Sequence, residues 1–131
     1  MTFKLVKEMD HRSLQVVRFV LAFSWVYQGV FPKLLTVAPL EKALTATIGL
    51  SPEHSCLLTK FAGVSEVLFG LALFFLYKNK PLLIFNIVAL TALALFVAIQ
   101  MPSLLIEAFN PVTTNLPLIV LSYVLLRARH L

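Results

Sequence analysis

Four long apolar stretches constrain the fold of this chain more than any other feature. They cover residues 13–31, 56–77, 81–101 and 111–129. A helix of ~20 residues, rising 1.5 Å per residue, crosses the ~30 Å hydrocarbon core of a bilayer. The fourth stretch begins at Asn110-Pro111, a helix cap followed by proline at the first helical position, and has Pro117 inside it, where we expect a kink. We therefore predict an all-α, polytopic membrane protein built as a four-helix bundle.

Composition excludes the soluble alternatives. Of 131 residues, 60% are hydrophobic and 13% are charged, whereas soluble domains have ~45–50% and ~25%. So short a chain cannot bury that much apolar surface, which excludes a soluble enzyme, a disordered chain and a disulfide-rich secreted domain. Because Cys56 is the single cysteine and the three histidines lie far apart, we predict neither a dithiol nor a metal site.

The basic residues predict how the chain is oriented. They gather before the first span, between the second and third, and after the fourth, namely at Lys4, Lys7, Arg12, Lys78, Lys80, Arg127 and Arg129. With four spans these segments share one face of the membrane. The positive-inside rule then predicts cytoplasmic N- and C-termini in a bacterial-type inner membrane. The net charge of +5 is thus an orientation signal and does not predict a nucleic-acid partner.

The segment between the first two spans contains a candidate short helix. Residues 39–49 read as amphipathic, with Pro39 opening the helix and Gly49 closing it. Such a helix would lie flat on the bilayer or cap the bundle. Ser51-Pro52 then has the pattern of a helix start for the second span.

Glu66 is the most informative polar residue, because a carboxylate near the middle of a span cannot reach the headgroups. Helical spacing puts it on a small-residue stripe that should meet another helix, made of Cys56, Thr59, Gly63, Glu66 and Gly70. Two interpretations remain open. Glu66 handles protons or contacts a ligand, or it is a structural partner of Arg18 or of hydroxyl groups on a neighbouring helix. Arg18 itself either turns toward Glu66 or snorkels to the headgroups.

Further polar residues gather at the outer ends of the spans, at Gln28, Lys33, Glu107, Asn110 and Asn115. They either form the mouth of a small-molecule pocket or make a Lys33–Glu107 surface pair with ordinary helix capping. In the third span, Asn86, Thr91 and Gln100 predict hydrogen bonds between helices.

Three segments resemble the DoxX-like family of membrane proteins: RFVLAFSWVYQGVFPKLL, FAGVSEVLFGL and FNPVTTNLPL. In that family an arginine-bearing first span ends in a G-x-x-P-K-like turn, the second span carries G-x-x-E-x-x-x-G, and the fourth opens with N-P-x-x-x-N. The matching residues here are Arg18, Gly29, Pro32, Lys33, Gly63, Glu66, Gly70, Asn110, Pro111 and Asn115. The resemblance is greatest to the branch that also occurs fused to short-chain dehydrogenase or epimerase-like domains.

The resemblance implies a link to membrane redox systems, since the family name derives from a subunit of a thiosulfate:quinone oxidoreductase. The sequence shows no haem-ligand pair, dithiol or dinucleotide motif, so a redox role would require a soluble oxidoreductase partner or a bound quinone. Our hypothesis is a quinone or similar hydrophobic molecule bound between the first, second and fourth spans, with Glu66 as the candidate catalytic group. The ligand-binding set would be Arg18, Gln28, Lys33, Glu66, Asn110 and Asn115. The alternative is a non-catalytic partner subunit, assembly module or homo-oligomer whose buried charges only fix helix packing.

Overall fold

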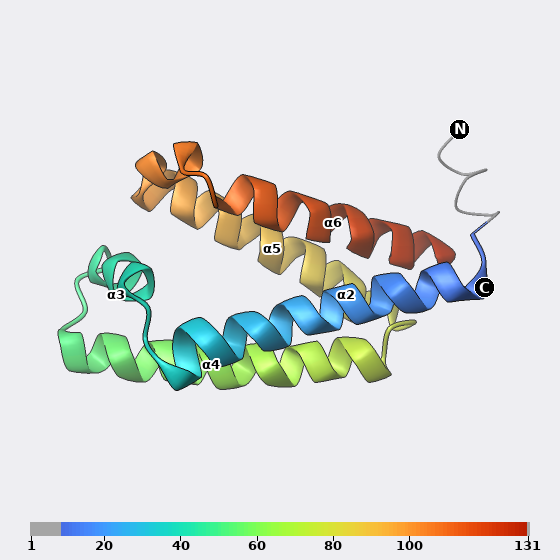
Figure 1. Ribbon diagram of the computed structural model, residues 1–131, viewed down its shortest axis with the longest axis horizontal. Helices are drawn as coiled ribbons and strands as arrows, with labels where there is room; N and C mark the ends of the chain where they lie inside the picture. Colours follow the sequence, from blue (N-terminus) through green and yellow to red (C-terminus); the bar gives the residue numbers. More distant parts are fainter. Residues whose placement is uncertain (1–8, 131) are drawn as a thin grey trace. The chain divides into compact units, whose positions relative to one another are not determined.

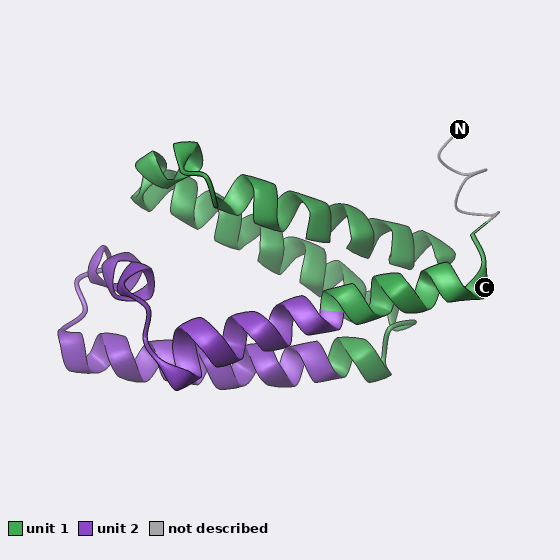
Figure 2. Cartoon of the chain, in the orientation of Figure 1, with its two compact units in different colours: residues 1–21, 72–131 green, residues 22–71 purple. Residues whose placement is uncertain are grey.

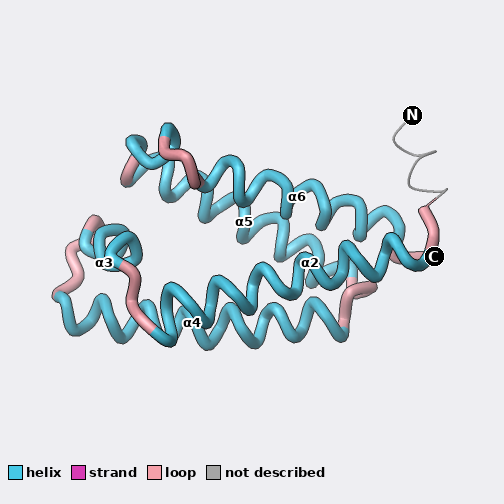
Figure 3. Tube along the Cα trace, in the orientation of Figure 1, coloured by secondary structure: helices cyan, strands magenta, loops and turns pink. Residues whose placement is uncertain are grey.

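The computed structural model describes residues 9–130, which form helices and loops with no strand among them (Figures 1 and 3). The elements are α2 (His11–Gly29), the π-helix η1 (Val30–Leu35), α3 (Pro39–Ala46), α4 (Pro52–Phe75), α5 (Lys80–Gln100), the 3₁₀-helix η2 (Pro102–Ile106) and α6 (Pro111–Ala128). Lys4 and Lys7, which enter the predicted orientation, lie outside the described residues.

Four helical segments of the described chain are long and apolar enough to cross a membrane. They are His11–Leu35, Pro52–Phe75, Lys80–Gln100 and Pro111–Ala128. Large apolar side chains along them are exposed, Phe61 and Phe75 to about 70%, as expected where a helix meets lipid instead of water. The predicted all-helical membrane fold is confirmed.

The chain divides into two compact units (Figure 2). Unit 2 comprises residues 22–71, and unit 1 the described residues on either side of that range. The helices α2 and α4 each contribute residues to both units.

In unit 1, asparagine caps begin α5 and α6. The side chain of Asn79 accepts a hydrogen bond from Leu82 N, and that of Asn110 accepts from Val112 N and Thr113 N. Each cap satisfies amides that have no partner within the helix. The start predicted at Asn110-Pro111 is confirmed, and α6 runs on through Pro117.

A buried polar contact joins α5 to α6. Asn86 Nδ2 donates to Ser122 Oγ at 2.5 Å, and both side chains are fully buried. Asn115 Nδ2 adds a second link by donating to the carbonyl of Leu90 at 3.1 Å. The interhelical bond predicted for Asn86 is confirmed, whereas Thr91 bonds to the carbonyl of Ile87 in its own helix.

At the start of α2, outside the apolar core of the first span, Asp10 accepts hydrogen bonds from the hydroxyl and amide of Ser13, at 2.6 and 2.9 Å. These bonds stabilise the carboxylate and lower the pKa of Asp10 below its usual value.

In unit 2, α2 and α4 approach each other through glycines. A Cβ atom added to Gly29 would lie 2.5 Å from the carbonyl oxygen of Gly63, and one added to Gly70 would lie 2.9 Å from that of Ala22. These pairings make the two helices antiparallel, and they confirm that the small-residue stripe of the second span meets another helix. Close to this contact, Trp25 and Phe69 pack edge to face, with ring centroids 4.9 Å apart.

The first span does not end where its apolar residues suggest. Beyond Gly29 the chain continues as the π-helix η1 to Leu35, and Pro32, which lacks an amide hydrogen, lies within it. The carbonyl of Pro32 accepts a bond from Ala38 N at 2.9 Å, which turns the chain toward α3. A π-helix segment is uncommon and frequently occurs at functional sites.

The predicted short helix is confirmed as α3, although it ends at Ala46 instead of Gly49. Gly49 lies in the following turn at φ +82°, which glycine adopts without strain. The hydroxyl groups of Thr45 on α3 and Ser55 on α4 form a hydrogen bond, so α3 packs against α4. Leu40 on α3 and Ile48 in the turn after it are exposed.

Candidate functional site

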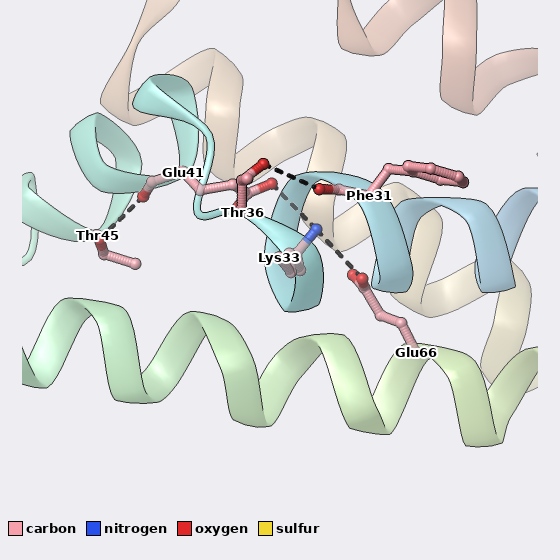
Figure 4. Close-up of polar contacts among 6 residues, drawn as sticks. All are labelled: Phe31, Lys33, Thr36, Glu41, Thr45 and Glu66. Atoms are coloured by element: carbon pink, nitrogen blue, oxygen red, sulfur yellow. Dashed lines mark hydrogen bonds and ion pairs between the residues drawn. The ribbon is translucent and has the colours of Figure 1, made fainter.

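Unit 2 contains a cluster of one lysine and two glutamates, which we name the Lys33 cluster: Lys33, Glu41 and Glu66. Lys33 Nζ lies 3.0 Å from Glu41 Oε1 and 3.2 Å from Glu66 Oε2, between the two carboxylates (Figure 4). The side chains of Lys33, Glu41 and Glu66 are only 10%, 21% and 16% exposed. The three residues come from η1, α3 and α4.

Helical spacing and glycine explain why Lys33 reaches Glu66. Ala22, Val26, Gly29 and Lys33 follow one another at steps of four, three and four, so they lie on the side of the first span that faces α4. A Cβ on Gly63 would lie 2.9 Å from the Cβ of Lys33. Because Gly63 has no side chain, the lysine lies directly against α4, one turn from Glu66.

Glu41 reaches the cluster because α3 is held against α4. Pro39 begins α3, and Glu41 lies in its first turn, where the helix dipole favours a negative charge. One turn later Thr45 Oγ1 donates to the carbonyl of Glu41 at 2.9 Å (Figure 4). The same hydroxyl also contacts Ser55 on α4. The polar side of α3 therefore faces the protein.

The charges of the cluster do not balance. One ammonium contacts two carboxylates, so the three groups carry one net negative charge when all are ionised. Glu66 Oε2 is buried and, apart from its contact with Lys33, has no hydrogen-bond partner among residues 9–130. The hydroxyl of Thr59, two turns earlier on α4, is also buried without a hydrogen-bond partner among these residues. Buried polar atoms normally have partners, so these two atoms can accept a hydrogen bond from a ligand or water.

In the structure the ion-pair partner of Glu66 is Lys33 and not Arg18. Arg18 Nε donates to the carbonyl of Phe74, and Nη1 donates to Gln15 Oε1 at 2.8 Å. Its guanidinium carbon lies 4.2 and 4.3 Å from the ring centroids of Phe74 and Tyr77. Arg18 thus binds the C-terminal end of α4, where carbonyls lack helical partners and the dipole favours a cation.

The other predicted site residues make contacts of their own. Asn110 caps α6 and donates from Nδ2 to the carbonyl of Glu107 at 2.8 Å, and Asn115 bonds to Leu90. Gln28 is exposed on α2. The surface pair considered for Lys33 and Glu107 is replaced by the two contacts of Lys33 within unit 2.

Glu41 was missed by the sequence analysis, although a signal for it existed. Glu41 and Thr45 are polar residues one turn apart on a helix whose other side carries Leu40 and Leu44. That pattern predicts a polar face, and Lys33 nearby in the sequence offers it a partner. Among residues 9–130 no group of three His, Cys, Asp or Glu side chains could hold a metal ion.

Chemically, the cluster offers a hydrogen-bond donor, an acceptor and a place for a proton. Lys33 has three N–H groups, and its two carboxylate contacts leave one of them for a ligand. Glu66 can accept a hydrogen bond when ionised and donate one when protonated.

Comparison with known proteins gives one match. No curated protein and no solved structure matches the chain significantly. The sequence model of the DoxX-like family matches residues 22–123, which include all of unit 2 and most of the remaining spans. This coverage, together with four helices able to cross a bilayer, makes the chain a multi-pass membrane protein of the DoxX-like family.

Proposed function

We propose that this protein binds the polar headgroup of a hydrophobic small molecule, a quinone, at Lys33 and Glu66. The observation that carries the proposal is a buried lysine–glutamate contact inside membrane-spanning segments. A charged side chain at the centre of a span costs ~2.5–3.5 kcal/mol even on the lenient insertion scale. Glu66, which lies well inside its span, is therefore a functional candidate by default, and Lys33 is its ionic partner near the end of the first span.

The residues present suit a quinone. A quinone has two carbonyl acceptors on an apolar ring, and the remaining N–H of Lys33 is a donor for one of them. The hydroxyl of Thr59, buried without a partner among the described residues, is a second candidate donor on the same side of α4. The isoprenoid tail of the quinone would lie in the lipid, against the apolar side chains that are exposed along the spans.

The proposed role in the cell follows from that binding. A bound quinone supplies two-electron redox chemistry coupled to protons, while Lys33 would orient its headgroup and Glu66 would hold a proton beside it. The electrons would come from a soluble oxidoreductase partner in a bacterial-type inner membrane.

The fluorescence of Trp25 provides the test, because it is the single tryptophan of the chain and lies two turns before Lys33. Adding a short-chain ubiquinone to the purified protein in detergent should quench this fluorescence with a saturable curve. The double variant K33M/E66Q should bind at least ~10-fold more weakly, because a hydrogen bond to a charged group contributes ~1.5–3 kcal/mol.

The matched control is K42M, which removes an exposed lysine from α3 in the same unit. It should bind quinone as the wild type does. Quenching that does not saturate, or that is equal in the wild type and K33M/E66Q, would contradict the proposal.

The second candidate function is a non-catalytic partner or assembly module. The close contact of Gly29 with Gly63 favours it, since glycine contacts alone can hold two membrane helices together. In that case the Lys33 cluster only fixes helix packing, no quinone binds, and E66Q impairs assembly of the protein instead of a ligand.

A further inference from the structure

We propose that the Lys33 cluster is a proton-binding site in which Glu41 and Glu66 share one exchangeable proton, with Glu41 as the group that passes it to water. The role of this proton in turnover rests on the function proposed above. Its existence does not, because it follows from the number of charges in the cluster and from where each group lies.

The charges of the Lys33 cluster do not cancel. Both carboxylates contact the same ammonium, and one ammonium balances only one of them. The three side chains are only 10–21% exposed, and an unbalanced charge in such shielded surroundings is disfavoured. A single added proton makes the three groups neutral.

No other charged group of unit 2 restores the balance. The remaining charged side chains and the histidine on α3 and α4 within this unit are exposed, namely Lys42, Glu53, His54 and Lys60, and the other titratable side chain there is the half-buried thiol of Cys56. Within unit 2, the ion pairs in the structure are the two made by Lys33. The groups that face Glu66 are thus Lys33 and Glu41.

The Lys33 cluster suits a proton better than a metal cation. The two carboxylates of the cluster have no third His, Cys, Asp or Glu beside them in the described chain that would complete a metal site. Two of their oxygens already contact Lys33. A proton needs only one free carboxylate oxygen, and Glu41 and Glu66 each have one beyond the contact with Lys33.

The positions of the three residues determine which of them exchanges the proton with water. Lys33 and Glu66 belong to candidate membrane spans, while Glu41 belongs to α3, which lies outside them. The side chain of Glu41 is also the most exposed of the three. Glu41 is therefore the member of the cluster best placed to meet water.

The transfer itself changes no covalent bond other than O–H and N–H. Lys33 Nζ lies within hydrogen-bond reach of both carboxyl groups, so it donates one proton to the carboxylate of Glu41 and takes up the proton of Glu66. Glu66 becomes ionised and Glu41 neutral, and Lys33 is again an ammonium at the end of the step. Glu41 then releases the proton to water, and the reverse sequence reloads the cluster.

Infrared spectroscopy of the purified protein at neutral pH tests the shared proton without any quinone. The wild type should show the carbonyl stretch of a protonated carboxyl group, shifted on transfer to D2O. E66Q and E41Q should each lose this band, because each leaves one carboxylate for one ammonium. The control E53Q, which alters an exposed glutamate in the first turn of α4, should keep it.

If the carbonyl band of the protonated carboxyl group persists in E41Q, or is absent from the wild type, the two glutamates do not share a proton. Loss of the band on adding sodium chloride would overturn the shared proton in favour of a bound cation. If E66Q does not fold, E41Q decides the question alone. The variant E41D should keep the band, but the band should shift more slowly after transfer to D2O because the shorter side chain exchanges its proton more slowly. An unchanged rate of this shift would refute the role of Glu41 as the group that passes the proton to water. Because these measurements use no quinone, their failure and a failure of quinone binding are distinguishable.

Discussion

Lys33 and the two glutamates contribute unequally to stability, because the ammonium contacts both carboxylates while each carboxylate contacts only the ammonium. Removing one member of a buried ion pair leaves an uncompensated charge, which is the costly outcome. Removing one of two carboxylates instead leaves a matched pair. The same change of one residue therefore has different consequences at the three positions.

K33M should lower the free energy of unfolding by ~3–5 kcal/mol, the range for breaking a buried pair. E66Q and E41Q should each lower it by less than ~1 kcal/mol, since a balanced lysine–glutamate pair remains. Thermal or denaturant unfolding in detergent micelles measures all three. Equal destabilisation by the three substitutions would show that the charge count does not govern the cluster.

At the scale of elements, α3 is held against α4 by few contacts. They include the hydrogen bond between Thr45 and Ser55 and the ion pair between Glu41 and Lys33. No side chain of α3 is fully buried, so its position depends on these polar contacts more than on apolar packing.

Cysteines placed at positions 45 and 55 should therefore cross-link. In a background where Cys56 is replaced by serine, T45C/S55C should form a disulfide under mild oxidation, because the two hydroxyl groups it replaces are in contact. Mass spectrometry detects the bond. The pair T47C/S55C is the control, since Thr47 is exposed. Equal cross-linking of both pairs would contradict the docked position of α3.

The elements themselves were largely predictable, because hydropathy and caps are local signals. The four spans, the short helix after Pro39 and the cap at Asn110 all follow from residues close together in the sequence. Hydropathy placed the end of the first span near Phe31, since Pro32 and Lys33 resemble a stop. The π-helix instead carries Lys33 onto the face that meets α4.

The contacts between elements were harder to predict. The carbonyl of Phe74 is 56 residues from Arg18, and nothing local indicates that the arginine binds the end of α4. Lys33 could have been assigned to Glu66 from the four-three-four spacing of Ala22, Val26, Gly29 and Lys33 opposite a glycine stripe. To decide which of several buried charged residues pair with each other, one must know how the helices pack, and a single sequence does not show this.

At the scale of the whole chain, the high hydrophobic content now has a physical meaning. Apolar side chains cover the outside of four membrane-spanning helices, and the polar residues inside them have specific contacts: Asn86 with Ser122, Arg18 with Phe74, and Lys33 with its two glutamates. The first two contacts join helices within unit 1. Cytoplasmic termini remain the prediction of the basic residues.

Ligand-induced stabilisation distinguishes a binding site at Lys33 and Glu66 from an ion pair that only fixes helix packing. Unfolding of the wild type and of K33M/E66Q would be measured in detergent with and without a short-chain ubiquinone. A ligand at 100 times its Kd stabilises the folded state by about 2.7 kcal/mol. We predict that the wild type gains this stability and that the double variant, whose folding without quinone is checked by its own unfolding curve, gains none. An equal gain in both proteins, or no gain in the wild type, would contradict the account.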